Sequence, residues 1–141
     1  MKDETLDFLQ ALDGGDWSTE EKKEKLYELV VRCNDQFKDC ALISVELGIF
    51  AGATLFPMAH AHKDLKRGEA IGIDAWSNAV CCEGANHPDN DKFWKGVNMK
   101  SILNKFTEAK KRDEWSGNVS HLQGKSDSFA NVFADESISV L

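Results

Sequence analysis

The sequence lacks several features that would assign it to a functional class directly. It has no apolar run of about 18 residues, the length that spans a membrane as a helix, and no signal-peptide or lipidation pattern. Positive charge is scarce, because 17 lysines and arginines stand against 24 aspartates and glutamates, a net charge of -7. Nucleic-acid backbones are bound by an excess of basic residues. We therefore expect neither a nucleic-acid nor a membrane partner.

The sequence also lacks cysteine spacings that would indicate a site. Cys33, Cys40, Cys81 and Cys82 form no Cys-x-x-Cys pair, and adjacent cysteines rarely bridge each other. Free thiols are typical of the reducing cytoplasm, so we expect a cytoplasmic protein. The polar segment at residues 81–91 matches no zinc or calcium ligand pattern, and no metal site is expected.

What the sequence does contain is enough apolar material for one ordinary domain. Its 141 residues are 42% hydrophobic and 29% charged. Residues 1–40 are acidic and have helical spacing, with a break at residues 13–17. Ser18 and Glu21 have the spacing of a capping box at the start of the second helix. We therefore expect a helical N-terminal segment over residues 1–40.

From residue 41 onward, apolar β-branched runs alternate with amphipathic stretches. Strands are predicted at residues 41–49, 69–76, 118–124 and 137–141, helices at 53–66, 92–114 and 126–134, and a polar loop at 77–91. This order is typical of right-handed crossovers in a parallel sheet with helices on both faces. We therefore predict an α/β, Rossmann-like, apparently truncated sheet of about four strands over residues 41–141.

Two glycines follow the first predicted strand. A parallel strand that enters a helix through such a turn presents backbone N–H groups at the positive end of the helix dipole. Gly48 permits the tight turn, and Gly52 lets a ligand and the helix approach the backbone closely. Glu46 lies inside the apolar strand and needs a hydrogen-bonding partner there. A backbone N–H of the turn or a ligand would provide that partner.

An acidic residue ends the second predicted strand. Asp74 lies about 20 residues after the glycines, where a carboxylate accepts hydrogen bonds from ribose hydroxyls. Trp76 follows it and is placed to lie against an adenine. Phe50 stands where a dinucleotide site needs a glycine to let the backbone touch a pyrophosphate. A nucleoside ligand without a pyrophosphate is favoured, and we expect Gly48, Gly52 and Asp74 to line one hollow.

The segments "VELGIFAGATLFPMA", "GIDAW" and "HLQGKSDSFANVFADESISVL" resemble the class I S-adenosylmethionine-dependent methyltransferases. The resemblance runs from about residue 17 to residue 141. It implies S-adenosylmethionine as the cofactor and methyl transfer to a small molecule, in this family often a sugar or another small metabolite. The resemblance also implies roles for particular residues. Glu46 and Gly48 would flank the methionine end of the cofactor, Gly52 would close the turn, and Asp74 would hold the ribose.

The third strand carries the remaining implied contacts. By the same resemblance, Gly124, Lys125 and Ser126 lie where the family contacts the adenine. No catalytic base can be nominated, because Gly-x-Ser-x-Gly is absent and Cys81 has no base at motif spacing.

The sequence departs from the family at its end. Family members complete the fourth strand and add three more strands with their helices, which supply much of the acceptor pocket. Here the residues end within that fourth strand. The chain would then be a fragment, or a second copy or another polypeptide would pair with the open sheet edge. The alternative function is a non-catalytic Rossmann-like interaction module that dimerises or docks through that edge.

Overall fold

Three parallel strands form the centre of the fold. The computed structural model describes residues 1–84 and 87–141. Its strands β1 (Ile43–Leu47), β2 (Glu69–Asp74) and β3 (Val119–Gln123) pair in parallel in the order β1-β2-β3. The predicted α/β class, with a parallel Rossmann-like sheet, flanking helices and a helical N-terminal segment, is confirmed.

The predicted fourth strand is reduced to a single bridge. Val140 pairs in parallel with Ser44, and the Val45 N–H donates to the Val140 carbonyl at 2.8 Å. This contact places the last residues beside β1, on the edge that β2 leaves open. The order of the chain across the sheet therefore reverses at β1. In open α/β sheets, ligands bind at such a reversal, outside the carboxyl ends of the strands.

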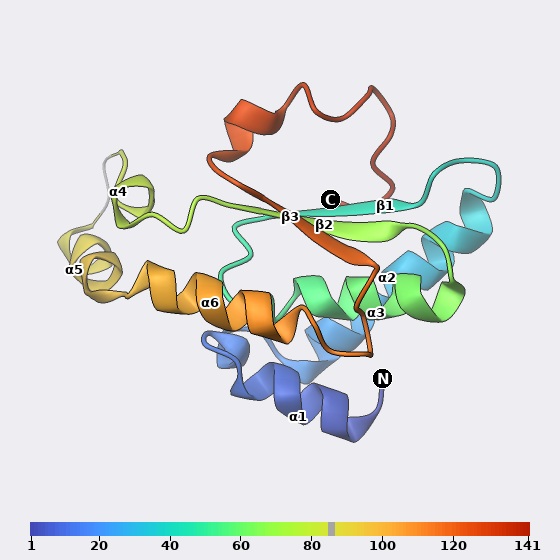
Figure 1. Cartoon of the computed structure of the whole chain (residues 1–141), viewed down its shortest axis with the longest axis horizontal. Coiled ribbons are helices and arrows are strands. Elements are labelled where there is room, and N and C mark those ends of the chain that lie inside the picture. Colours follow the sequence, from blue (N-terminus) through green and yellow to red (C-terminus); the bar gives the residue numbers. More distant parts are fainter. Residues whose placement is uncertain (85–86) are drawn as a thin grey trace.

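The helices that cover the sheet lie on one face of it (Figure 1). They are α1 (Asp3–Ala11), α2 (Glu20–Gln36), α3 (Leu55–Leu65) and α6 (Met99–Ala109). Residues 124–139 pass over the opposite face (Figure 1). The expectation of helices on both faces is therefore wrong for the described part of the chain. Instead of a helix at 126–134, that segment has one 3-10 turn, η2 (Ser126–Phe129), because its Ser and Asp side chains favour local turns over a helix.

The predicted helix at residues 92–114 is two helices. The first, α5 (Pro88–Gly96), starts with a proline at its first turn, where the missing N–H costs little. The second, α6, starts after Asn98, whose side chain accepts from the Ser101 N–H at 3.0 Å. The expected loop at 77–91 contains a short helix, α4 (Asn78–Cys81), and its residues 85–86 lie outside the described residues. The break follows from Gly96 and the Asn98 cap, both strong helix-end signals.

The N-terminal helices are joined through a short 3-10 turn, η1 (Gly15–Trp17). The expected cap of α2 is wrong by one residue, because Thr19 accepts from the Lys22 N–H at 3.2 Å. Ser18 is instead 8% exposed, and its Oγ has no hydrogen-bond partner among the described residues.

A buried lysine holds this turn in place. Lys23 Nζ donates to Gln10 Oε1 at 2.5 Å, to the Gly15 carbonyl at 2.7 Å and to the Ser18 carbonyl at 3.1 Å. All three N–H groups of the ammonium are used, as a buried charge requires. Burial lowers the pKa of Lys23 from its usual value. Lys23 therefore helps to fix residues 15–18, together with the backbone bonds from Gly15 to Leu12 and from Trp17 to Gly14.

The core lies between the sheet and its helices. The rings of Phe56 and Trp115 stack with centroids 4.6 Å apart, and Phe106 stacks on Phe56 at 5.5 Å. All three side chains are fully buried. None of the described helices combines the length and the apolar character needed to cross a bilayer.

Candidate functional site

A cleft of about 520 Å³ lies at the carboxyl ends of the strands. This volume falls within the range of small-molecule sites. Six of the eight residues that the sequence singles out line it: Glu46, Gly48, Asp74, Gly124, Lys125 and Ser126. The N-terminal segment forms another wall, through Asp13, Trp17, Ser18 and Lys22. The other two predicted residues, Gly52 and Trp76, do not line the cleft.

Gly52 serves the core rather than the cleft. Its φ is +90°, which favours glycine, and an added Cβ would lie 2.6 Å from the Phe56 ring and 3.0 Å from the Phe106 ring. The close approach to the Gly52 backbone that the spacing predicts does occur, but two aromatic rings make it instead of a ligand. The neighbouring Ala51 and Ala53 line the cleft in its place. The expectation that Gly48, Gly52 and Asp74 share one hollow is wrong for Gly52.

Gly48 opens onto the cleft. Its φ is +76°, and an added Cβ would meet no atom within 4 Å. Its N–H donates to the Ile73 carbonyl at 2.8 Å, which ties the end of β1 to the end of β2. The conformation required at this turn therefore explains the glycine. The N–H group is used within the protein, so it does not point freely toward a ligand.

Asp74 and Trp76 together hold the backbone of Phe50. Asp74 Oδ2 accepts from the Phe50 N–H at 2.8 Å, and Oδ1 accepts from the Trp76 N–H at 2.7 Å. Trp76 Nε1 donates to the Phe50 carbonyl at 2.9 Å. Phe50 has a φ of +50°, an uncommon conformation for an aromatic residue, and these bonds stabilise it. Each Asp74 oxygen keeps a second lone pair for a further donor.

Trp76 is a core residue. Its ring is buried, 5.4 Å from the ring of Phe106 and 5.7 Å from that of His121. The expectation that it lies against an adenine does not fit this position. A φ of +41° at Trp76 turns its side chain toward α6.

Glu46 has one satisfied and one unsatisfied oxygen. Thr54 Oγ1 donates to Glu46 Oε1, which links the end of β1 to the start of α3. Oε2 is buried and has no hydrogen-bond partner among the described residues. Burial raises the pKa of Glu46 to about 7, although the Thr54 hydrogen bond and the charge of Lys22 act in the opposite direction. A buried unpaired oxygen of this kind costs free energy that a donor would recover.

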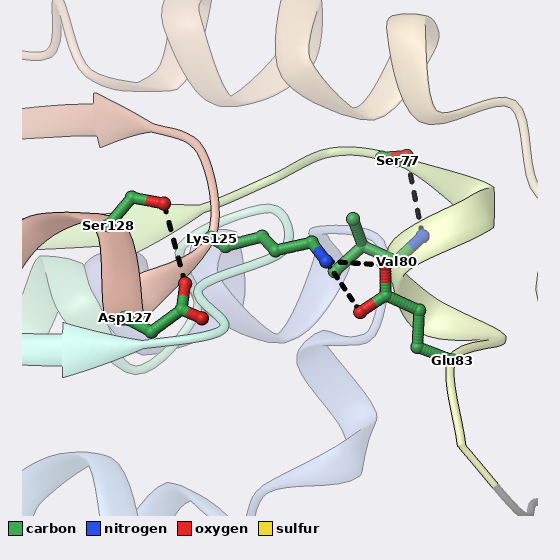
Figure 2. Close-up of polar contacts among 6 residues, drawn as sticks. All are labelled: Ser77, Val80, Glu83, Lys125, Asp127 and Ser128. Carbon is green, nitrogen blue, oxygen red and sulfur yellow. Dashed lines mark hydrogen bonds and ion pairs between the residues drawn. The ribbon is translucent and has the colours of Figure 1, made fainter.

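Lys125 bridges two sides of the cleft. Its Nζ lies 2.5 Å from Glu83 Oε1 and 2.7 Å from Oε2, so the segment after β3 reaches the end of α4 (Figure 2). Ser77 caps α4 by accepting from the Val80 N–H at 3.4 Å (Figure 2). The Lys125 ammonium is thus held by an exposed carboxylate. The adjacent Gly124 donates its N–H to the Asp74 carbonyl at 2.9 Å.

Four aromatic rings form a group, three of which line this cleft, and the sequence did not predict the group. We call Trp17, Phe50, Phe93 and Trp94 the aromatic cluster. Spacing suggests Phe93 and Trp94 as core residues, but Phe93 is 50% exposed and Trp94 lines the cleft. Trp17 comes from a turn with no periodic pattern, so no sequence signal places it here. Phe50 offers one signal, an aromatic residue in a glycine-rich turn.

The described residues contain no group of three or more His, Cys, Asp or Glu side chains placed to hold a metal ion. Comparison of the chain with protein-family models, with curated proteins and with solved structures gave no match.

Proposed function

We propose that the cleft binds S-adenosylmethionine and that the chain is the cofactor-binding part of a methyltransferase that acts on a small molecule. The observation that carries the proposal is Glu46 Oε2, a buried oxygen without a partner at the reversal point of a parallel sheet. A cationic amino group is the donor that best satisfies a carboxylate in such a place. The methionine end of the cofactor carries such a group.

The other lining residues fit the rest of the cofactor. Gly48 leaves open space beside Glu46, where a side chain would obstruct the cleft. Asp74 keeps one lone pair on each oxygen for ribose hydroxyls. Gly124, Lys125 and Ser126 follow β3 and would contact the adenine. The chain would thus hold an elongated ligand across the ends of its three strands.

When bound, S-adenosylmethionine supplies an electrophilic methyl group: its carbon–sulfur bond breaks as a bond to an acceptor oxygen or nitrogen forms, and the acceptor loses a proton. The residues of this chain contribute mainly position, by fixing the two reactants in the cleft.

Isothermal titration with S-adenosylmethionine and with its demethylated product tests this proposal. We expect both to bind the wild-type chain. Glu46→Gln should weaken binding about tenfold or more, because it removes the charge and keeps the shape. Glu69→Gln is the matched control, because Glu69 starts β2 at the opposite end of the sheet and hydrogen-bonds Ser120 at 2.8 Å. Absence of heat with both ligands would refute the proposal.

An interaction module is the second candidate. It is favoured by the large apolar side chains that are exposed beside the sheet, Leu47, Val132 and Leu141. A module that dimerises through its sheet edge would scatter light as a species twice the 15.7 kDa chain. A monomer at every concentration, together with cofactor binding, would favour the methyltransferase.

A further inference from the structure

Each ring of the aromatic cluster contacts at least two of the others. Trp17 and Phe50 stack with centroids 5.0 Å apart and planes inclined by 23°. Trp94 meets both edge-on, at 6.2 Å from Trp17 and 5.9 Å from Phe50. Phe93 closes the group, 6.0 Å from Trp17. Trp17, Phe50 and Trp94 line the cleft, whereas Phe93 does not.

Trp17 is held in a position that leaves it in water. Trp17 is 58% exposed, although tryptophan is highly buried on average in folded proteins. The bonds of Lys23 fix the turn that carries it, and the Asp74 and Trp76 bonds fix the backbone of Phe50 beneath it. The protein therefore orders a large apolar ring at the cleft without burying it. A planar ligand would cover that ring.

A polar group beside Trp17 also lacks a partner. Ser18 is 8% exposed and lines the cleft, and its Oγ has no hydrogen-bond partner among the described residues. A serine hydroxyl both donates and accepts, so it suits a ligand hydroxyl. Trp94 offers no such polar group, because its Nε1 donates to Asn90 Oδ1 at 3.0 Å. The site thus combines apolar ring faces with one unsatisfied hydroxyl.

We propose that the aromatic cluster and Ser18 bind the methyl acceptor, and that this acceptor is a planar aromatic compound with a ring hydroxyl. The ring would stack on Trp17, and the ligand hydroxyl would bond to Ser18 Oγ. That the bound compound is the methyl acceptor rests on the proposed methyltransferase function. The stacking site itself depends on the geometry of the cluster alone.

The cluster is distinct from the expected adenine position. Phe50 follows β1, whereas Gly124 and Ser126 follow β3, and β2 lies between those strands. Neighbouring strands are about 4.8 Å apart, so the two strand ends are roughly 10 Å apart. One planar ring cannot stack at both places. The aromatic cluster is therefore separate from the adenine position and can hold a second planar ring.

Titration calorimetry with catechol and naphthalene-2,3-diol tests the proposal, with cyclohexane-1,2-diol as the saturated counterpart. We expect the planar diols to bind and the saturated diol not to bind. Trp17→Leu, which keeps an apolar side chain but removes the planar ring, should weaken binding about fivefold or more. Ser18→Ala should weaken it by a similar factor, because the hydroxyl loses its partner. Phe37→Leu is the matched control, because this ring is also partly exposed but lies outside the cleft, and it should change affinity by less than about twofold.

The affinity for S-adenosylmethionine is measured on the same variants. It should change by less than about twofold in Trp17→Leu. Equal binding of the saturated diol, no binding of either planar diol, or no effect of Trp17→Leu would overturn the proposal. An equal loss of cofactor affinity in Trp17→Leu would also overturn it, because the ring would then serve the adenine. Planar diols that bind to a chain without cofactor affinity would refute the methyltransferase and leave the stacking site standing. Circular dichroism confirms the fold of each variant.

Discussion

The two faces of the sheet differ in what covers them and in what they hold. On the helical face, Ser44 bonds to His62 of α3 at 2.9 Å, and Glu46 bonds to Thr54 at the start of α3. Because side chains alternate along a strand, Val45 and Leu47 point to the other face. Leu47 is 52% exposed there. β1 thus turns its polar side chains toward the helices and its apolar ones toward the thinner cover.

This arrangement concentrates the buried polar groups on the helical face. Polar groups on the helical face need partners because they are buried, and His62 has two, Ser44 and the Arg67 carbonyl at 2.9 Å. Glu46 keeps one oxygen without a partner on that same face. The helical face therefore carries most of the packing and also the unsatisfied carboxylate oxygen of the candidate site. The second face contributes less to either, and three predictions test the contrast.

The largest effect should come from the aromatic stack on the helical face. Phe56→Ala removes a fully buried ring that contacts Trp115 and Phe106, and it should lower the free energy of unfolding by about 3–5 kcal/mol. Urea unfolding measures the change. Phe93→Ala is the matched control, since half of that ring is already in water, and it should cost less than about 1 kcal/mol. Equal losses would mean that burial does not decide stability here.

The second effect depends on pH and has the opposite sign. The folded chain raises the pKa of Glu46 to about 7 from an unperturbed value of 4.5, so the folded state holds this proton more tightly than the unfolded state. The contribution of protonated Glu46 to the free energy of unfolding is fully present below pH 4.5 and is lost as the pH rises through 7. Glu46→Gln should therefore stabilise the chain by roughly 3 kcal/mol at pH 8 relative to pH 4.

Urea unfolding of the wild type and Glu46→Gln across that pH range measures the difference. Burial lowers the pKa values of His60, His62 and His121, which makes the fold less stable as the pH falls below 6.5. Both proteins share these histidines, so the difference between them isolates Glu46. A difference that stays constant with pH would contradict the assignment. If the variant is more stable and binds S-adenosylmethionine less well, the buried Glu46 carboxylate destabilises the ligand-free protein, and ligand binding offsets that destabilisation.

The same contrast explains what the sequence could predict. The parallel strands and α3 follow from β-branched runs and from Gly48, which are local signals. The position of the Trp76 ring does not follow from such signals. Trp76 has a positive φ and its ring packs in the core against Phe106, and no local sequence pattern predicts that conformation. The position of Trp17 depends on Lys23, which reaches three groups in the preceding residues. Contacts of this kind are tertiary, and the periodicity of the sequence does not predict them.

The region after β3 is a further case. Its pattern suggested a helix at 126–134, yet only the turn Ser126–Phe129 forms. A helix there would need an apolar stripe to bury against the sheet, because short helices are marginal without packing. Val132 lies in this segment and is 60% exposed, and Phe129 and Phe133 are only partly buried, so the segment buries no continuous apolar stripe. The second face therefore has only a thin cover, because a helix in this segment would bury little apolar surface.

The smallest effect should therefore come from this cover. Val132→Ser exchanges an exposed apolar side chain for a polar one and should change the free energy of unfolding by less than about 0.5 kcal/mol. The comparison is Val45→Ser, which acts on the same face but at a side chain that is nearly fully buried, and it should cost well over 1 kcal/mol. Both are measured by urea unfolding at two protein concentrations. A loss above about 1 kcal/mol for Val132→Ser that grows with concentration would show that a second copy covers this face, because only association makes stability depend on concentration. The contrast between the two faces would then describe the monomer alone, and the interaction module would become the better function.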